Sequence, residues 1–150
     1  MDLNDEVRIE APKDVVYAAL NDPEILKDTI PGCQELEKVS DNELEAKVQL
    51  KIGPVKATFN GKVTLDPTGA PDHFSLSGEG SGGVAGFAKG GADVELVEDG
   101  NGTILRYEAK ADVGGKIAQL GSRLIKGTAK KLSSQFFISF SERVGAGAEV

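Results

Sequence analysis

This chain is poor in the residues that build metal sites, disulfides and crowded aromatic cores. Its 150 residues include no Trp, one Met, one Cys (Cys33) and one His (His73), and aromatic residues make up only 5%. A single Cys cannot form an internal disulfide, and a single His cannot supply a His-rich zinc site. We therefore expect no metal, no cofactor and residence in the reducing cytoplasm.

Long apolar runs are also missing. No stretch approaches the ~18 apolar residues of a membrane span, and the acidic start of the chain is unlike a signal peptide. Hydrophobic residues (39%) and charged residues (27%) are close to the globular average. We predict one domain over residues 1–144, followed by a flexible tail over 145–150.

The charge is acidic overall and unevenly distributed. A net charge of −7 and an isoelectric point of about 4.8 disfavour binding to nucleic-acid phosphates. Residues 112–143 carry six cations and two anions, whereas residues 1–111 carry eleven cations and twenty-one anions, and the last anion is Glu149. The C-terminal segment therefore opposes the rest of the chain in sign.

Hydrophobic periodicity predicts an α+β order of elements. Alternation predicts a strand over 3–11, and helical spacing predicts two short helices, one with Pro12 as its first residue and one that begins at Pro23 with Asp22 as its N-cap. Alternation then returns and predicts a meander of antiparallel strands with one apolar face. Apolar residues at every third or fourth position after 114–115 predict a last helix of about seven turns, which we expect to cover that face.

Small residues recur at inward positions of neighbouring strands, and two interpretations remain open. Residues such as Gly61 and Ala92 either allow close packing of the long helix, which carries Gly121 and Gly127, or leave an apolar cavity beneath it. We favour the cavity because Trp and Met, which would fill it, are scarce. We expect it to be lined by Ile30, Val48, Leu50, Phe59, Gly61, Phe74, Leu76, Phe87, Ala92, Leu105, Tyr107, Leu120, Leu124 and Thr128.

Glycines are concentrated between residues 78 and 91. The stretch 78–83 matches the pattern of a dinucleotide-binding loop, but it leads into a strand rather than a helix, so we interpret it as part of a glycine-rich hairpin. This hairpin is either a mobile lip over the cavity or a plain loop.

Cations gather on one side of the last predicted helix. Lys116, Arg123, Lys126 and Lys130 fall within about an 80° arc beside its apolar stripe. They form either an ordinary solvated face or a docking edge for anionic lipid headgroups or an acidic protein patch.

No catalytic constellation is visible in the sequence. Cys33 lacks a nearby base, and His73 lies in a predicted turn, so neither is expected to take part in catalysis. Asp5, Tyr107 and Thr128 are the inward-facing polar residues from which a small cyclase or hydrolase would have to build a dyad.

Several motifs, taken in order, carry a family resemblance. They are residues 30–33, 48–54, 59–63, the pair Gly102-Thr103 with Tyr107, residues 113–115 and residues 120–125. With these motifs, the chain resembles the G subunit of carbon monoxide dehydrogenase, a family of the START-like (SRPBCC, helix-grip) superfamily. The resemblance implies a seven-stranded antiparallel sheet around a long C-terminal helix, two short helices after the first strand, and an apolar cavity between sheet and helix.

The resemblance also implies a function. The family is encoded beside aerobic molybdenum-containing carbon monoxide dehydrogenases and related hydroxylases, and is regarded as accessory rather than catalytic. It implies binding of an apolar small molecule such as a quinone or lipid, and recruitment of the enzyme to the inner face of the membrane. The alternatives are a protein-only assembly factor for the dehydrogenase, or a small cyclase or hydrolase of the same superfamily.

Overall fold

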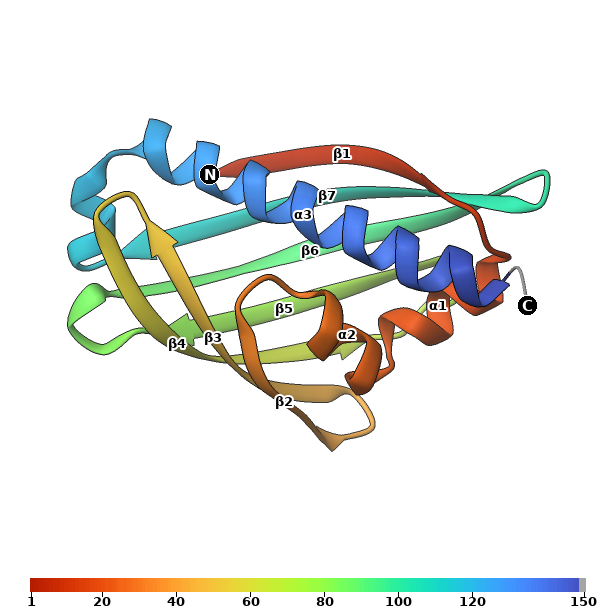
Figure 1. Ribbon diagram of the computed structural model, residues 1–150, viewed down its shortest axis with the longest axis horizontal. Coiled ribbons are helices and arrows are strands. Elements are labelled where there is room, and N and C mark those ends of the chain that lie inside the picture. Colours follow the sequence, from red (N-terminus) through yellow and green to blue (C-terminus); the bar gives the residue numbers. More distant parts are fainter. Residues whose placement is uncertain (149–150) are drawn as a thin grey trace.

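Seven strands form one antiparallel sheet in the computed structural model, which describes residues 1–148 and is shown in Figure 1. A long helix lies across one face of the sheet, and two short helices follow the first strand. In chain order the elements are β1 (Asp2–Ile9), α1 (Lys13–Leu20), α2 (Pro23–Thr29), β2 (Cys33–Ser40), β3 (Glu43–Ile52), β4 (Val55–Asp66), β5 (His73–Ser81), η1 (Gly83–Ala85), β6 (Phe87–Asp99), β7 (Gly102–Gly114), η2 (Lys116–Leu120) and α3 (Ser122–Ala148).

The strands are arranged in the order β1-β7-β6-β5-β4-β3-β2, with every neighbouring pair antiparallel. This confirms the predicted fold, a sheet that wraps around a C-terminal helix. Val48 lies opposite Phe59 and Leu50 opposite Ala57, so the apolar residues of β3 and β4 share one face. Side chains alternate between faces along a strand, and this parity turns the apolar set toward α3.

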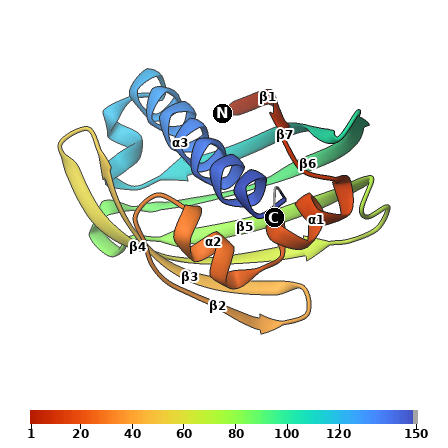
Figure 2. The ribbon, with the colours of Figure 1, turned by 45° about the vertical axis from the view of Figure 1, so that its right-hand side comes forward.

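Helix α2 begins at Pro23 as its sequence predicts, and α1 begins one residue later than predicted, with Pro12 as its N-cap. The Asp22 side chain accepts a hydrogen bond from the Glu24 backbone N–H at 3.0 Å, and Pro23 occupies the first turn of α2. Figure 2 shows α1 and α2 beside the C-terminal part of α3. Arg143 of α3 forms an ion pair with Asp28 of α2, which ties these two helices together.

The long helix begins later than its periodicity predicts. Gly121 has φ of 93°, a left-handed value that separates the 3₁₀ helix η2 from α3. Lys116 therefore does not lie on α3, and Gly127, which does, is exposed and meets nothing within 4 Å of an added Cβ. These two glycines do not face the sheet. Helix α3 continues to Ala148, through part of the predicted tail, whose last two residues lie outside the described part.

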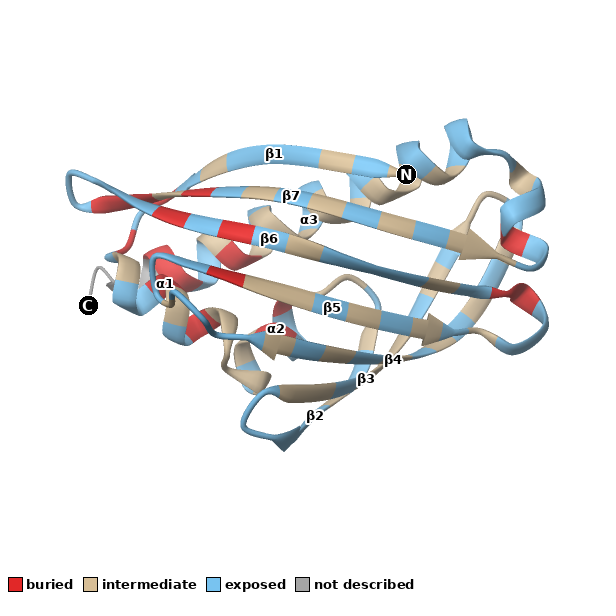
Figure 3. Cartoon of the chain, turned by 180° about the vertical axis from the view of Figure 1, so that it is seen from behind, coloured by how far each residue is buried: buried red, intermediate tan, exposed pale blue. Residues whose placement is uncertain are grey.

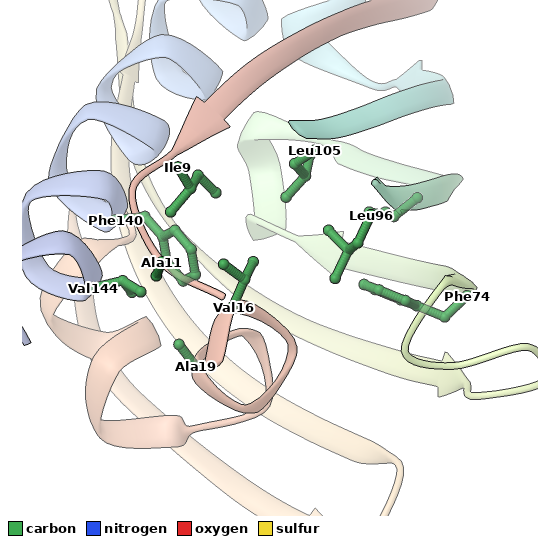
Figure 4. Close-up of a cluster of buried hydrophobic side chains, with 10 residues drawn as sticks. Ile9, Ala11, Val16, Ala19, Phe74, Leu96, Leu105, Phe140 and Val144 are labelled. Carbon is green, nitrogen blue, oxygen red and sulfur yellow. The ribbon is translucent and has the colours of Figure 1, made fainter. Parts of the chain in front are cut away.

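The packed core is confined to one end of the molecule. Phe140 and Val144 from the end of α3 meet Ile9 of β1 and Val16 of α1, as Figure 4 shows. Both Phe140 and Ile9 are fully buried. The remaining members of this cluster are Ala11, Ala19, Phe74, Val94, Leu96 and Leu105. In Figure 3 the buried positions of the sheet gather at the same end, beside α1.

A buried hydrogen bond fixes the chain between β1 and α1. The Thr103 hydroxyl of β7 donates to the carbonyl oxygen of Ala11 at 2.7 Å, and the Thr103 side chain is completely buried. A buried carbonyl without a partner is costly, so this bond helps to hold α1 against the sheet.

We expect Phe140→Ala to lower the free energy of unfolding by about 3–5 kcal/mol, because the Phe140 side chain is fully buried and its removal leaves a cavity in the core. Urea denaturation followed by circular dichroism measures this loss. The matched control is Phe87→Ala, where the ring is 49% exposed and the loss should be about 1 kcal/mol or less. Equal losses in both variants would contradict the one-ended core.

Thr103→Val should cost about 1–3 kcal/mol of unfolding free energy, because the Ala11 carbonyl keeps its burial and loses its donor. Thr58→Val, at an exposed position of β4, should change the value by no more than about 0.5 kcal/mol. The same denaturation experiment compares the two. A neutral Thr103→Val variant would show that the bond contributes nothing.

Candidate functional site

Burial decreases along the strands with distance from the core. On β7, Leu105 is buried at 1% exposure, whereas Tyr107 and Ala109, on the same face, are only partly buried. On β6, Val94 is buried and Ala92 is not. The face that is packed at one end of the sheet is therefore accessible to water farther along.

The second half of this face is apolar yet nowhere closed. We call it the half-buried interior. It is defined by ten apolar residues of intermediate exposure, seven on the helix-facing side of the sheet and three on η2 and α3: Val48, Leu50, Phe59, Val63, Ala109, Ala111, Val113, Leu120, Ile125 and Leu132. Beyond it the molecule closes again, because Ile117 of η2 and Ala85 of η1 are buried at 2% and 4% exposure. The half-buried interior thus lies between two closed ends.

A row of small residues crosses the sheet in this region. Ala46, Gly61, Gly80 and Ala88 lie in register on four adjacent strands. An added Cβ on Gly61 would meet only the main-chain oxygens of Glu79 and Ala46, at 3.5 and 4.0 Å. Helix α3 therefore does not pack down onto this glycine, as close helix-sheet packing would require.

A groove of about 740 Å³ runs between β1 and α3. The Tyr107 ring in this groove stacks on Phe137 with 5.5 Å between centroids. The hydroxyl of Ser141 is buried and has no hydrogen-bond partner in the described structure. The sequence did not single out Phe137, Ile138 or Ser141, because their neighbours on β1 are more than a hundred residues away along the chain.

The structure separates the residues predicted to line the cavity. It brings the larger group together on the helix-facing side of the sheet or at the start of α3: Val48, Leu50, Phe59, Gly61, Leu76, Ala92, Tyr107, Leu120, Leu124 and Thr128. Phe74 and Leu105 belong to the packed core instead. Phe87 has the opposite parity to Ala88, is half exposed, and lies over Gly114. Ile30 follows α2 and is half-buried.

The β3–β4 turn meets the start of α3 at the edge of the half-buried interior. An added Cβ on Gly53 would lie 2.8 Å from a Leu124 methyl carbon and 4.0 Å from one of Leu120, so the turn touches the start of the helix. Leu124 is 39% exposed there. The predicted docking residues Arg123, Lys126 and Lys130 are exposed on α3, whereas Lys116 is exposed on η2.

Of the three polar residues from which a cyclase or hydrolase would build a dyad, Asp5 and Tyr107 lie together and Thr128 lies apart. Asp5 lies opposite Tyr107 in the β1–β7 register, and both line the β1–α3 groove. The Asp5 carboxylate accepts a hydrogen bond from the Glu6 backbone N–H at 2.8 Å. The Thr128 hydroxyl donates to the carbonyl of Leu124 at 2.9 Å and does not line that groove.

Cys33 is held in its neutral form. Burial raises the pKa of its thiol above the ordinary value, and the nearby Lys27 offsets only part of this effect. A raised thiol pKa lowers the fraction of nucleophilic thiolate at neutral pH. Within residues 1–148, no group of three His, Cys, Asp or Glu side chains is placed to hold a metal ion.

A hollow of about 1020 Å³ has a mixed lining. Eight of its sixteen lining residues are charged, on α2 and β2 to β6, and the others include Phe87 and the row of Ala46, Gly61, Gly80 and Ala88. Its charged part suits water rather than an apolar molecule. The apolar candidate site is therefore the half-buried interior together with the adjoining β1–α3 groove.

Solved structures of other proteins share this fold. A conserved protein from Geobacillus kaustophilus has 30% identity and a TM-score of 0.90, over 97% of this chain and 96% of that one. A START superfamily protein from Mycobacterium smegmatis has 14% identity and a TM-score of 0.73, over 95% and 96% of the two chains. A STAR-related lipid transfer protein from Xanthomonas axonopodis has 20% identity and a TM-score of 0.63, over 95% and 85%.

No curated protein matches the sequence. No helix in the described part of the chain has both the length and the apolar character that spanning a membrane requires. The family model for the G subunit of carbon monoxide dehydrogenase (CoxG) matches residues 6–145. Nearly the whole chain is covered, and its START-like fold agrees, so the protein belongs to the CoxG family of carbon monoxide dehydrogenase.

Proposed function

We propose that this protein is a non-catalytic accessory protein that holds an apolar small molecule between its sheet and α3. The observation that carries the proposal is the half-buried interior: seven apolar side chains of the sheet and three of η2 and α3 lie there, and none of them is buried. Apolar surface that a fold leaves open in this way marks a binding site, because covering it is favourable by roughly 25 cal/mol per Å².

The chemistry of the site favours a neutral, apolar ligand. Its lining is aliphatic with few aromatic rings, and the row of Ala46, Gly61, Gly80 and Ala88 adds no polar side chain. A quinone or a lipid has the required apolar character. We propose the former class as an electron acceptor because the family is named for a dehydrogenase.

The partner that we propose is an aerobic molybdenum carbon monoxide dehydrogenase or a related hydroxylase, which the protein would couple to the membrane. The family membership supports this proposal. A catalytic role is not favoured, because Thr128 lies apart from Asp5 and Tyr107, and the Asp5 carboxylate already accepts a hydrogen bond from the main chain. A protein-only assembly factor would not need the half-buried interior.

Gly61→Leu should lower the affinity for an apolar probe at least about tenfold, because the new side chain projects into the half-buried interior and an added Cβ meets no side chain on the way. Titration with the neutral fluorescent dye Nile red measures the affinity. Solvent extraction and mass spectrometry of the purified wild-type protein should in addition recover a quinone or a lipid.

Thr58→Leu is the matched control, because residue 58 lies on the same strand as Gly61 but points to the other face of the sheet and is exposed. It should leave Nile red binding unchanged. Equal binding by wild type and Gly61→Leu, with unchanged stability, would reject the interior as the ligand site. The assembly factor would be favoured by two results together: the Gly61→Leu variant still co-purifies with the dehydrogenase, and the wild-type protein yields no bound ligand.

A further inference from the structure

Three connections of the chain meet at the end of the molecule away from the core. They are the β3–β4 turn, the β5–β6 connection through η1, and the β7–α3 connection through η2, which Figure 1 shows together at its left side. In an antiparallel meander, alternate connections share an end. Segments that are far apart in sequence thus form one surface.

This surface contains no carboxylate. Residues 50–61, 80–88 and 113–131 hold seven cations and no Asp or Glu, whereas the rest of the chain holds ten cations and twenty-four carboxylates. We call this surface the cationic end and define it by Lys51, Lys56, Lys116, Arg123, Lys126, Lys130 and Lys131. All seven are exposed, and in the part of the chain that the structure describes none of them forms an ion pair.

Two of these cations are placed where they destabilise the fold. Lys51 and Lys56 lie directly opposite each other across the β3–β4 hairpin. Like charges in such a pair are destabilising, so the pair does not support the hairpin. The Gly53 turn between them touches Leu124, so this pair adjoins the start of α3 with its own cations.

An apolar apex belongs to the same end. Val84 in η1 is 93% exposed, while its neighbour Ala85 is buried, so the loop is anchored with the Val84 side chain held outward. The anchor is the approach of Gly86 to Ile117: an added Cβ on Gly86 would lie 3.2 Å from an Ile117 side-chain carbon. Phe87 and Leu124 at this end are 49% and 39% exposed.

We infer that the cationic end docks on an anionic lipid surface, with Val84 entering the headgroup region. An exposed apolar apex on η1, which contacts the cation-bearing β4 and η2, fits a membrane interface, where apolar burial and attraction to anionic lipids act together. An acidic protein would satisfy the charges but not require the apex. The inference rests on the proposed function in one respect: docking brings the contact of Gly53 with Leu124, at the edge of the half-buried interior, to the bilayer, where apolar ligands reside.

Co-sedimentation with vesicles tests the inference directly. The full chain should bind vesicles of phosphatidylcholine with about one third phosphatidylglycerol, bind pure phosphatidylcholine weakly, and lose binding as salt rises. The double variant Lys51→Glu/Lys56→Glu should lower the partition coefficient about thirtyfold or more, because each cation contributes about 1 kcal/mol near an anionic surface. Val84→Asp should lower it about tenfold.

Matched controls lie at other surfaces. Lys38→Glu/Lys110→Glu makes the same change in net charge on exposed β2 and β7 positions, and Val39→Asp changes a β2 valine that is 43% exposed. Both should bind vesicles nearly as well as the wild type. The small loss expected comes only from the more negative net charge of the variants, which weakens attraction to anionic lipids. Equal losses in test and control variants would overturn the assignment of this surface.

The outcome is distinguishable from that of the ligand proposal. Val84→Asp should keep Nile red binding, and Gly61→Leu should keep vesicle binding. No binding to anionic vesicles, with dehydrogenase co-purification lost in the Lys51/Lys56 double variant, would overturn the lipid assignment and give the surface to an acidic protein. Vesicle binding that survives in both Val84→Asp and the double variant would also overturn it.

Discussion

The structure depends on the burial of Phe140 and Val144 against Ile9 and α1. This contact holds the last turns of α3 against the sheet at one end. Helix α1 and the end of β1 lie at the same end. Burying such side chains contributes about 1.5–3 kcal/mol each. Because the helix is secured there, and touches the β3–β4 turn at its other end through Leu124, the region between need not be filled. An unfilled apolar region is the physical basis of the candidate site.

Periodicity predicted most of this fold. Alternation identified the strands and the helix-facing parity, and the Asp22-Pro23 pair identified the start of α2. The break at Gly121 escaped because Ile117 and Leu120 are three residues apart, a spacing that a 3₁₀ turn and an α-helix share. Periodicity reports which residues are buried together. It does not report the sign of φ at a glycine.

From the sequence, only the face of the sheet that holds the site was predictable, not which residues on that face stay open. Leu76 and Phe74, or Tyr107 and Leu105, have the same parity, but which of each pair is packed depends on where α1 and Phe140 settle, a tertiary outcome. Phe87 escaped the parity argument because η1 interrupts the strand before it. For the β1–α3 groove, one signal was available: Ser141 interrupts apolar residues in the last turns of the helix, where a serine finds few partners.

The opposed ends of the molecule also explain why the charge of the chain is misleading when summed along the sequence. A sum over residues 1–111 is strongly negative and hides Lys51 and Lys56, because the acids nearest to them in sequence, Glu45 and Asp66, lie farther along β3 and β4 from the turn. The antiparallel meander brings those two lysines beside the cations of η2 and α3 instead. One half of α3 is thus specialised for packing and the other for exposure. The open apolar surface, the seven cations of the cationic end and the exposed Val84 all belong to the half that the core leaves free.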